Sequence, residues 1–148
     1  MYHTQTGRTG AMADAVRRGA TDPTIDLEVR FLRARMAGTG DLLWADGLIL
    51  GTPENFGYMS GAMKDFMDRT YYPVEGKVQG LPYCLFVAAG NDGTGAVRAV
   101  RRIANGYALR EVQEPIISVG EVSQPILDRC EEMGKGMAAA LEAGIFRT

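Results

Sequence analysis

The stretch GLILGTPENFGYMSGAMKDFMDRTYY, from Gly47 to Tyr72, decides the fold. It opens with Leu48–Leu50, an unbroken apolar run typical of strands that are covered on both faces of a parallel sheet. Pro53 cannot donate a hydrogen bond to a neighbouring strand, so we expect the strand to end there. Ser60 is a favourable helix cap. The residues after it repeat at helical spacing and predict a helix whose inner face is Ala62, Met63, Phe66 and Met67.

The loop from Thr52 to Met59 joins this strand to this helix. Ligands of open parallel sheets bind beyond the carboxyl ends of the strands, so the loop lies where a ligand is expected. Phe56 and Tyr58 can lie against a flat ring, and Gly57 lets the main chain approach it closely. The alternative is an ordinary connection whose aromatic residues cover the end of the sheet.

The rest of the chain alternates between strand and helix patterns. Tyr83–Ala89 and Ile116–Val119 are further apolar runs that predict buried strands. Ile25–Phe31 alternates strictly between apolar and charged residues, which predicts a half-exposed strand at a sheet edge. Tyr71–Pro82 is expected to be irregular. Strands alternating with helices predict one doubly wound α/β domain over residues 1–148.

Composition excludes several classes of function. The formal net charge of −2 gives no basic footprint for nucleic acid. There is no apolar run near the length of a membrane span and no signal peptide, so a cytoplasmic protein without membrane contact is expected. Cys84 and Cys130 lie in apolar patterns without metal-ligand or CxxC spacing, so both are expected to be buried and no metal site is expected.

The N-terminal residues MYHTQTGRTG precede a helical pattern. Hydroxyl groups and free backbone N–H groups at a helix N-terminus favour a phosphate. The spacing and the lysine of a Walker loop are absent, and a capped loop rich in threonine and glycine is the alternative. His3 is the only histidine, and a structural role is favoured over acid–base work.

The order and content of three loops, TQTGRT, TPENFGYM and AGNDGTG, resemble the flavodoxin-like superfamily. The resemblance is strongest to flavodoxin family proteins and to their NAD(P)H-dependent FMN or quinone reductase relatives. It implies a flavodoxin-like fold with strand order 2-1-3-4-5 and FMN as the cofactor. The FMN phosphate would be held by Thr4, Gln5, Thr6, Gly7, Arg8 and Thr9. The flavin ring would be lined on one side by Pro53, Glu54, Asn55, Phe56 and Gly57, and on the other by Ala89, Gly90, Asn91, Asp92, Gly93 and Gly95. No catalytic side chain is expected, because the flavin itself carries the redox chemistry.

The sequence departs from this family in two places. The family has an apolar strand before the phosphate loop, whereas here Met1 and Tyr2 stand directly before it. We therefore expect the first strand, an interior one, to be missing or truncated, and the sequence not to be the whole functional polypeptide. In addition, AGNDGTG contains no aromatic residue, so one face of the flavin is expected to be open.

Three functions follow from these observations. The leading hypothesis is an NAD(P)H-dependent FMN or quinone reductase that passes electrons to a quinone or similar small acceptor. The alternative is a flavodoxin-type one-electron carrier that serves a redox protein, although a net charge of −2 offers little acidic docking surface. The third is a binding module without flavin. Whether NADH or NADPH is used, and whether the chain forms a homo-oligomer, are left open.

Overall fold

A parallel sheet forms the centre of the computed structural model, which describes residues 1–146. β1 (Leu48–Pro53) pairs with β2 (Pro82–Ala89), which is buried at every position. β3 (Arg110–Glu111) pairs with the beginning of β2, and β4 (Ile116–Val119) pairs with its end. The three strands predicted from apolar runs are therefore confirmed. β3 was not anticipated, because two residues are too few to show a pattern.

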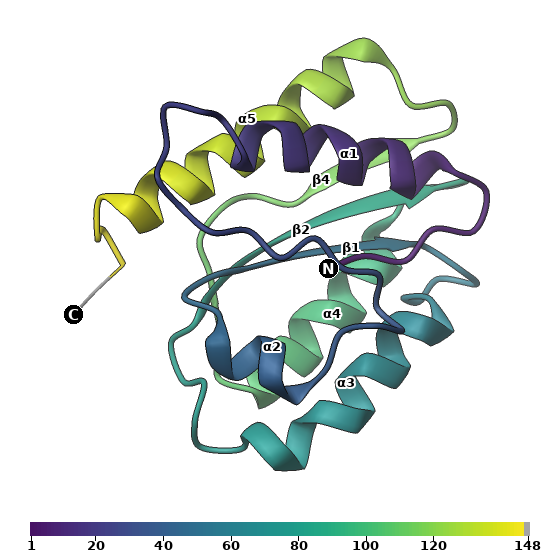
Figure 1. Cartoon of the computed structure of the whole chain (residues 1–148). Helices are drawn as coiled ribbons and strands as arrows, with labels where there is room; N and C mark the ends of the chain where they lie inside the picture. The colour runs from purple at the N-terminus through teal and green to yellow at the C-terminus, as the bar shows by residue number, and fades with distance from the viewer. Residues whose placement is uncertain (147–148) are drawn as a thin grey trace.

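Helices cover both faces of this sheet (Figure 1). One face is covered by α1 (Arg8–Ala20) and α5 (Gln124–Glu142). The other is covered by α2 (Thr39–Trp44), α3 (Gly61–Val74) and α4 (Thr94–Gly106). The backbones of α1 and α5 touch where they cross, because a Cβ on Gly134 would lie only 2.0 Å from the carbonyl oxygen of Val16. The doubly wound α/β architecture is the one predicted.

Helix α3 begins as its sequence predicts and ends later. The Oγ of Ser60 accepts a hydrogen bond from the backbone N–H of Met63 at 3.2 Å, and the predicted inner face is buried. The prediction that irregular structure starts at Tyr71 is wrong, because the helix continues to Val74 with Pro73 inside its last turn. Val74 is fully buried, so packing against the core holds this last turn in place.

The residues Met1–His3 lie between β1 and the extended segment that precedes α2. Tyr2 bridges Arg33 on one side and Gly51 on the other, both in parallel orientation. Its backbone N–H donates to the carbonyl of Leu32 at 3.0 Å. These residues therefore take the position that the strand order 2-1-3-4-5 assigns to the end of the first strand.

The segment Ile25–Phe31 has the predicted alternation of exposure but is not a regular strand. Asp26, Glu28 and Arg30 are exposed, and the apolar residues between them are half-buried. Within residues 1–146, no backbone hydrogen bond joins positions 27–31 to a neighbouring strand. The prediction of a regular edge strand is wrong for this reason: an extended segment becomes a strand only when a neighbour pairs with it.

Both cysteines are buried and free, as predicted. Burial raises the pKa of the Cys84 thiol to about 12 and that of the Cys130 thiol to about 11. Since the thiolate is the reactive form, both groups are unreactive at neutral pH. Among the helices of residues 1–146, none combines the length and the apolar character needed to cross a membrane.

Candidate functional site

Three loops meet at the carboxyl ends of the parallel strands and form the candidate site, which we call the rim. Residues 4–9 follow the N-terminal segment, residues 53–59 follow β1, and residues 90–95 follow β2. The first two loops are joined by the amide of Asn55, whose Nδ2 donates to Oε1 of Gln5 at 3.1 Å. The fold thus brings together the three loops that the sequence singles out.

The loop of residues 4–9 is closed by the hydroxyl of Thr4. Its Oγ1 accepts hydrogen bonds from the backbone N–H groups of Gly7 at 3.2 Å and Gly10 at 3.0 Å. Thr6 is exposed at the tip of the loop, whereas Thr9 is only 2% exposed. The hydroxyl group presented to a ligand at the surface of this loop is therefore that of Thr6.

Some backbone N–H groups near the start of α1 are unpaired within residues 1–146. In the part of the chain that the structure describes, the N–H groups of Thr6, Arg8 and Thr9 have no hydrogen-bond partner. Unpaired N–H groups and the helix dipole together make a helix N-terminus attractive to an anion. This loop has the chemistry expected of a phosphate site.

The guanidinium of Arg8 is engaged with a fourth loop. Its Nη2 lies 2.7 Å from Oε1 of Glu121, which follows β4 and has a side chain that is 91% exposed. An exposed ion pair of this kind is worth only about 0–1 kcal/mol, so a dianion could compete with Glu121 for the arginine. Glu121 was not identified from the sequence, because a contact between residues so far apart leaves no local pattern.

The loop of residues 53–59 contains a tight two-residue turn. Asn55 and Tyr58 exchange both of their backbone hydrogen bonds, at 2.9 and 3.0 Å. Phe56 and Gly57 between them have φ angles of 52° and 72°, the left-handed combination of a type I′ turn. A bulky residue in this region costs about 1–2 kcal/mol. Phe56 is also fully exposed, so a strained turn presents an aromatic ring to solvent at the end of the sheet.

Glu54 connects the second loop to the third. Its Oε1 accepts from the N–H of Gly93 at 3.2 Å, and its Oε2 accepts from the N–H of Ala96 at 3.1 Å. The carboxylate thereby caps the N-terminus of α4 from a different loop, where the helix dipole favours a negative charge. The sequence predicted that Glu54 lines a ring, and this capping role was not anticipated.

The same two loops also touch through their backbones. A Cβ on Gly95 would lie only 2.2 Å from the carbonyl oxygen of Gly57, so a side chain at position 95 would force the loops apart. This direct packing and the two hydrogen bonds of Glu54 join residues 53–59 and 90–96 into one unit.

The loop of residues 90–95 offers a surface of small and polar groups. Gly90, Asn91 and Asp92 are exposed, while Ala89 and Gly93 are buried. Hydrogen bonds from the backbone and the hydroxyl of Thr94 hold the pKa of the Asp92 carboxyl below its usual range. The side chains that this loop exposes are therefore small or polar.

His3 lies just before the first loop. Its Nδ1 is buried without a hydrogen-bond partner among the described residues. Burial, together with the charges of Arg35 and Arg33, lowers the pKa of His3, so the ring is neutral at pH 7.

The rim brings together three kinds of group. Free N–H groups belong to the loop of residues 4–9, the exposed ring of Phe56 belongs to the loop after β1, and exposed small or polar residues belong to the loop after β2. A group with a phosphate and a planar ring system suits these residues. A family model described as NADPH-dependent FMN reductase matches residues 36–124, more than half of the chain. The chain belongs to this family. The expectation that FMN is the cofactor is thereby confirmed.

Proteins similar to this member of the FMN reductase family include a flavodoxin and a quinone dehydrogenase. The chain is 39% identical to "Flavodoxin" of Aquifex aeolicus (strain VF5) over 95 residues, which are 64% of this chain and 51% of that protein. It is 32% identical to "NAD(P)H dehydrogenase (quinone)" of Paracoccus denitrificans (strain Pd 1222) over 88 residues, 47% of this chain and 42% of that protein. The chain thus spans about half the length of these relatives.

Solved structures show the same fold. A flavodoxin from the domain Archaea superposes with a TM-score of 0.79 at 21% identity, covering 95% of this chain and 94% of that one. A WrbA-like flavodoxin from Agrobacterium tumefaciens gives a TM-score of 0.75 at 24% identity, covering 94% and 92%. The flavodoxin-like fold expected from the sequence is confirmed.

Proposed function

We propose that the chain binds FMN at the rim and is an oxidoreductase that accepts electrons from NAD(P)H and passes them to a quinone or a similar small acceptor. The observation that carries the proposal is the asymmetry of the rim. The loop after β1 exposes an aromatic residue, Phe56, whereas the exposed residues of the loop after β2 are small or polar. Membership of the NADPH-dependent FMN reductase family and the similarity to the NAD(P)H dehydrogenase (quinone) of Paracoccus denitrificans support it.

The residues of the first loop would hold the phosphate of FMN. The backbone N–H groups of Thr6, Arg8 and Thr9 have no partner within residues 1–146, so they could bond the phosphate without breaking another hydrogen bond. The hydroxyl of Thr6 and the guanidinium of Arg8 would add charge-assisted hydrogen bonds. These groups would hold the cofactor at one end, and the loops 53–59 and 90–95 would orient its ring.

Bound FMN supplies the capacity to take up a hydride and to release electrons, so the protein needs no acid, base or nucleophile of its own. Its part is to hold the ring and leave room for the substrate. Reacting atoms must come within about 3–3.5 Å of each other for hydride transfer. Gly90, Asn91 and Asp92 place no large side chain in the way of a nicotinamide or quinone ring.

A one-electron carrier is the second candidate, and the 39% identity to a flavodoxin favours it. The two candidates differ in which reductants the bound cofactor accepts. A carrier would exchange electrons with a protein and would not react with a free nicotinamide. A reductase would be reduced by NADPH or NADH directly.

The test is anaerobic reduction of the FMN-loaded protein, followed by its visible absorption. We expect NADPH or NADH to bleach the flavin rapidly, in a single two-electron stage, and catalytic NAD(P)H oxidation when a benzoquinone is added. Reduction by dithionite alone, in two separate one-electron stages, would contradict the reductase and favour the carrier. A protein that binds no FMN by fluorescence quenching would contradict both.

A further inference from the structure

A groove of about 670 Å³ lies between α4 and the chain that leads into β4. This volume is within the range of about 300–1,000 Å³ that is typical of small-molecule sites. One wall is a stripe along α4 that consists of Thr94, Val97, Arg98, Arg101, Arg102 and Asn105. The other wall consists of Glu114, Pro115 and Ile117. The groove therefore follows α4 along nearly its whole length.

The groove meets the rim at Thr94, which belongs both to the loop of residues 90–95 and to the first turn of α4. Ile117 of the opposite wall packs against the same loop, because a Cβ on Gly93 would lie 2.5 Å from its Cγ2 atom. At a rise of about 1.5 Å per residue, the stripe extends about 12 Å from Thr94 to Arg102. A long ligand with one end at the rim can therefore reach this arginine with its other end.

Two arginines of the stripe, Arg98 and Arg102, are exposed and have no ion-pair partner within residues 1–146. Arg101, by contrast, is held by Glu111, since its Nε lies 3.0 Å from Oε1 and its Nη2 lies 2.9 Å from Oε2. Arg98 and Arg102 are one helical turn apart, and like charges at this spacing repel each other. A bound anion would remove this repulsion, so the stripe favours a negatively charged ligand.

The carboxylates near the stripe leave these two arginines unpaired. Glu114 lines the groove but forms no ion pair with Arg98 or Arg102 in the described part of the chain. Hydrogen bonds from Thr94, with a smaller contribution from the charge of Arg98, lower the pKa of the Asp92 carboxyl. The backbone N–H and the hydroxyl of Thr94 donate to Oδ1 of Asp92, at 2.9 and 2.8 Å. Neither carboxylate therefore bridges the two guanidinium groups.

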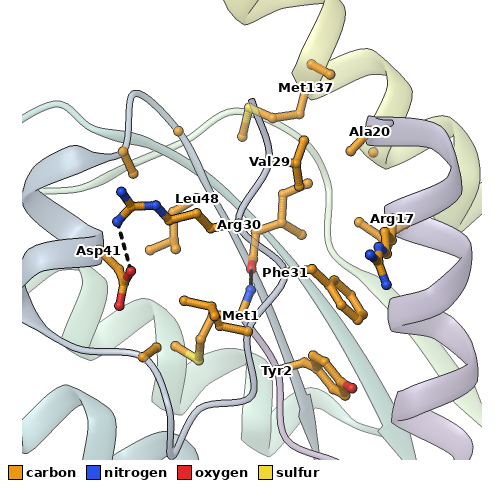
Figure 2. Close-up of a pocket in the computed structure, with 18 of the residues that line it drawn as sticks. Met1, Tyr2, Arg17, Ala20, Val29, Arg30, Phe31, Asp41, Leu48 and Met137 are labelled. Carbon is orange, nitrogen blue, oxygen red and sulfur yellow. Dashed lines mark hydrogen bonds and ion pairs between the residues drawn. The ribbon is translucent and has the colours of Figure 1, made fainter. Parts of the chain in front are cut away.

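A second hollow, of about 330 Å³, differs in this respect. It lies between β1 and the segment 27–32, and the arginine at its margin is paired: Nη1 of Arg30 lies 3.0 Å from Oδ1 of Asp41 (Figure 2). Its lining includes the apolar side chains of Val29, Leu48 and Met137. Of the two hollows, the groove along α4 is therefore the one suited to an anionic group.

We propose that this groove binds the adenosine end of NADPH and that Arg98 and Arg102 bind its 2′-phosphate. NADPH carries the nicotinamide at one end and, at the other, an adenosine whose 2′-phosphate is absent from NADH. The adenosine would lie against the apolar part of the lining, Val97, Pro115 and Ile117. Guanidinium groups suit a phosphate because each can donate two parallel hydrogen bonds to it. The subsite rests on the function proposed above, since the nicotinamide is placed at the rim, and it selects NADPH over NADH.

The probe is adenosine 2′,5′-bisphosphate, which carries the 2′-phosphate of NADPH without the nicotinamide. Isothermal titration calorimetry of the protein, with and without FMN, should show one bisphosphate bound per chain. Adenosine 5′-monophosphate, which lacks the 2′-phosphate, should bind about tenfold more weakly or worse, because the charge-assisted hydrogen bonds are lost. If inorganic phosphate displaces the bisphosphate at equal concentration, the groove is a general anion patch and the proposal is wrong.

Arg98→Gln and Arg102→Gln each remove one guanidinium and keep a residue that favours helix. Each should weaken bisphosphate binding by about fivefold or more, and should lower the ratio of kcat/KM for NADPH to that for NADH by a similar factor. Arg129→Gln is the matched control, because it makes the same change at an exposed position of α5, on the other face of the sheet. It should change neither quantity. Circular dichroism shows whether each variant is folded.

The outcomes separate this proposal from the reductase function. If the FMN-loaded protein oxidises NADPH and NADH equally well and the Arg98 and Arg102 variants alter neither rate, the subsite is overturned and the reductase function stands. If it oxidises neither nicotinamide but binds the bisphosphate through Arg98 and Arg102, the reductase function fails and the adenosine 2′-phosphate site stands. Bisphosphate binding that neither variant weakens also overturns the subsite.

Discussion

Glu54 offers the sharpest test of how the rim is built. Replacing it by glutamine keeps the size of the side chain but removes the charge, and one of the two backbone donors, Gly93 or Ala96, then faces an NH₂ group. A capping side chain is worth about 0.5–2 kcal/mol. A charge near a helix N-terminus adds about 0.3–1 kcal/mol at an exposed site. Since Glu54 is half-buried, we expect Glu54→Gln to lower the free energy of unfolding by about 1–2 kcal/mol.

The same change should weaken FMN binding. Residues 53–59 and 90–96 are joined by the Glu54 carboxylate, so its loss lets the two walls move independently and the cofactor must order them on binding. A cost of about 1–2 kcal/mol corresponds to a fall in affinity of roughly 5–30-fold. Urea unfolding measures the first effect and quenching of FMN fluorescence measures the second.

Glu132→Gln is the control, because it makes the same change at an exposed position of α5, outside the three loops of the rim. It should leave FMN affinity within about twofold of the wild type, since surface substitutions away from a site change free energies by about 0.5 kcal/mol or less. If Glu54→Gln lowers the stability but leaves FMN affinity unchanged, Glu54 is only a helix cap, and the reasoning that joins the two walls is wrong.

Four further experiments test the remaining assignments. Thr6→Ala should weaken FMN binding by about 1–3 kcal/mol, measured by fluorescence quenching, and unchanged affinity would remove the hydroxyl from the phosphate site. Gly95→Ala should lower the unfolding free energy by about 1–3 kcal/mol in urea, because its Cβ would clash with Gly57; a neutral result would show that the loops separate easily. Cys84 and Cys130, with pKa values raised to about 12 and about 11, should resist alkylation at pH 8 until urea unfolds the chain; rapid alkylation of the native protein would show that the core opens. Asn91→Tyr should slow NAD(P)H oxidation more than it weakens FMN binding, and equal effects would mean that residue 91 does not border the path of the nicotinamide.

Much of the fold follows from features that are local in the sequence. The apolar run of β2 spans the whole strand, and Ser60 marks the start of α3, so both could be predicted from neighbouring residues. The three loops could be placed at one edge because parallel strands end on the same side. The segment Ile25–Phe31 shows the limit of this reasoning. Its alternation predicts exposure correctly, but strand formation depends on a neighbour that no local pattern reports.

The contacts that join the loops of the rim connect residues that are far apart in the sequence. Glu54 reaches Ala96, and Arg8 reaches Glu121, across distances in the sequence that leave no periodic signal. The sequence could indicate that residues 53–57 lie at the edge of the sheet where the parallel strands end, because their loop follows a buried strand. It could not indicate that a carboxylate in that loop would hold the next loop in place.

The strain at Phe56 has to be maintained by its surroundings. A phenylalanine with a φ of 52° and a fully exposed ring gains nothing from packing that would offset the cost of this conformation. The turn is held instead by the paired backbones of Asn55 and Tyr58 and by the contact of Gly57 with Gly95. Because Glu54 fixes that contact through α4, the backbone that carries the Phe56 ring is held in place before any ligand arrives. A cofactor that binds such a site does not have to order its walls, and the affinity that would be lost to ordering is retained.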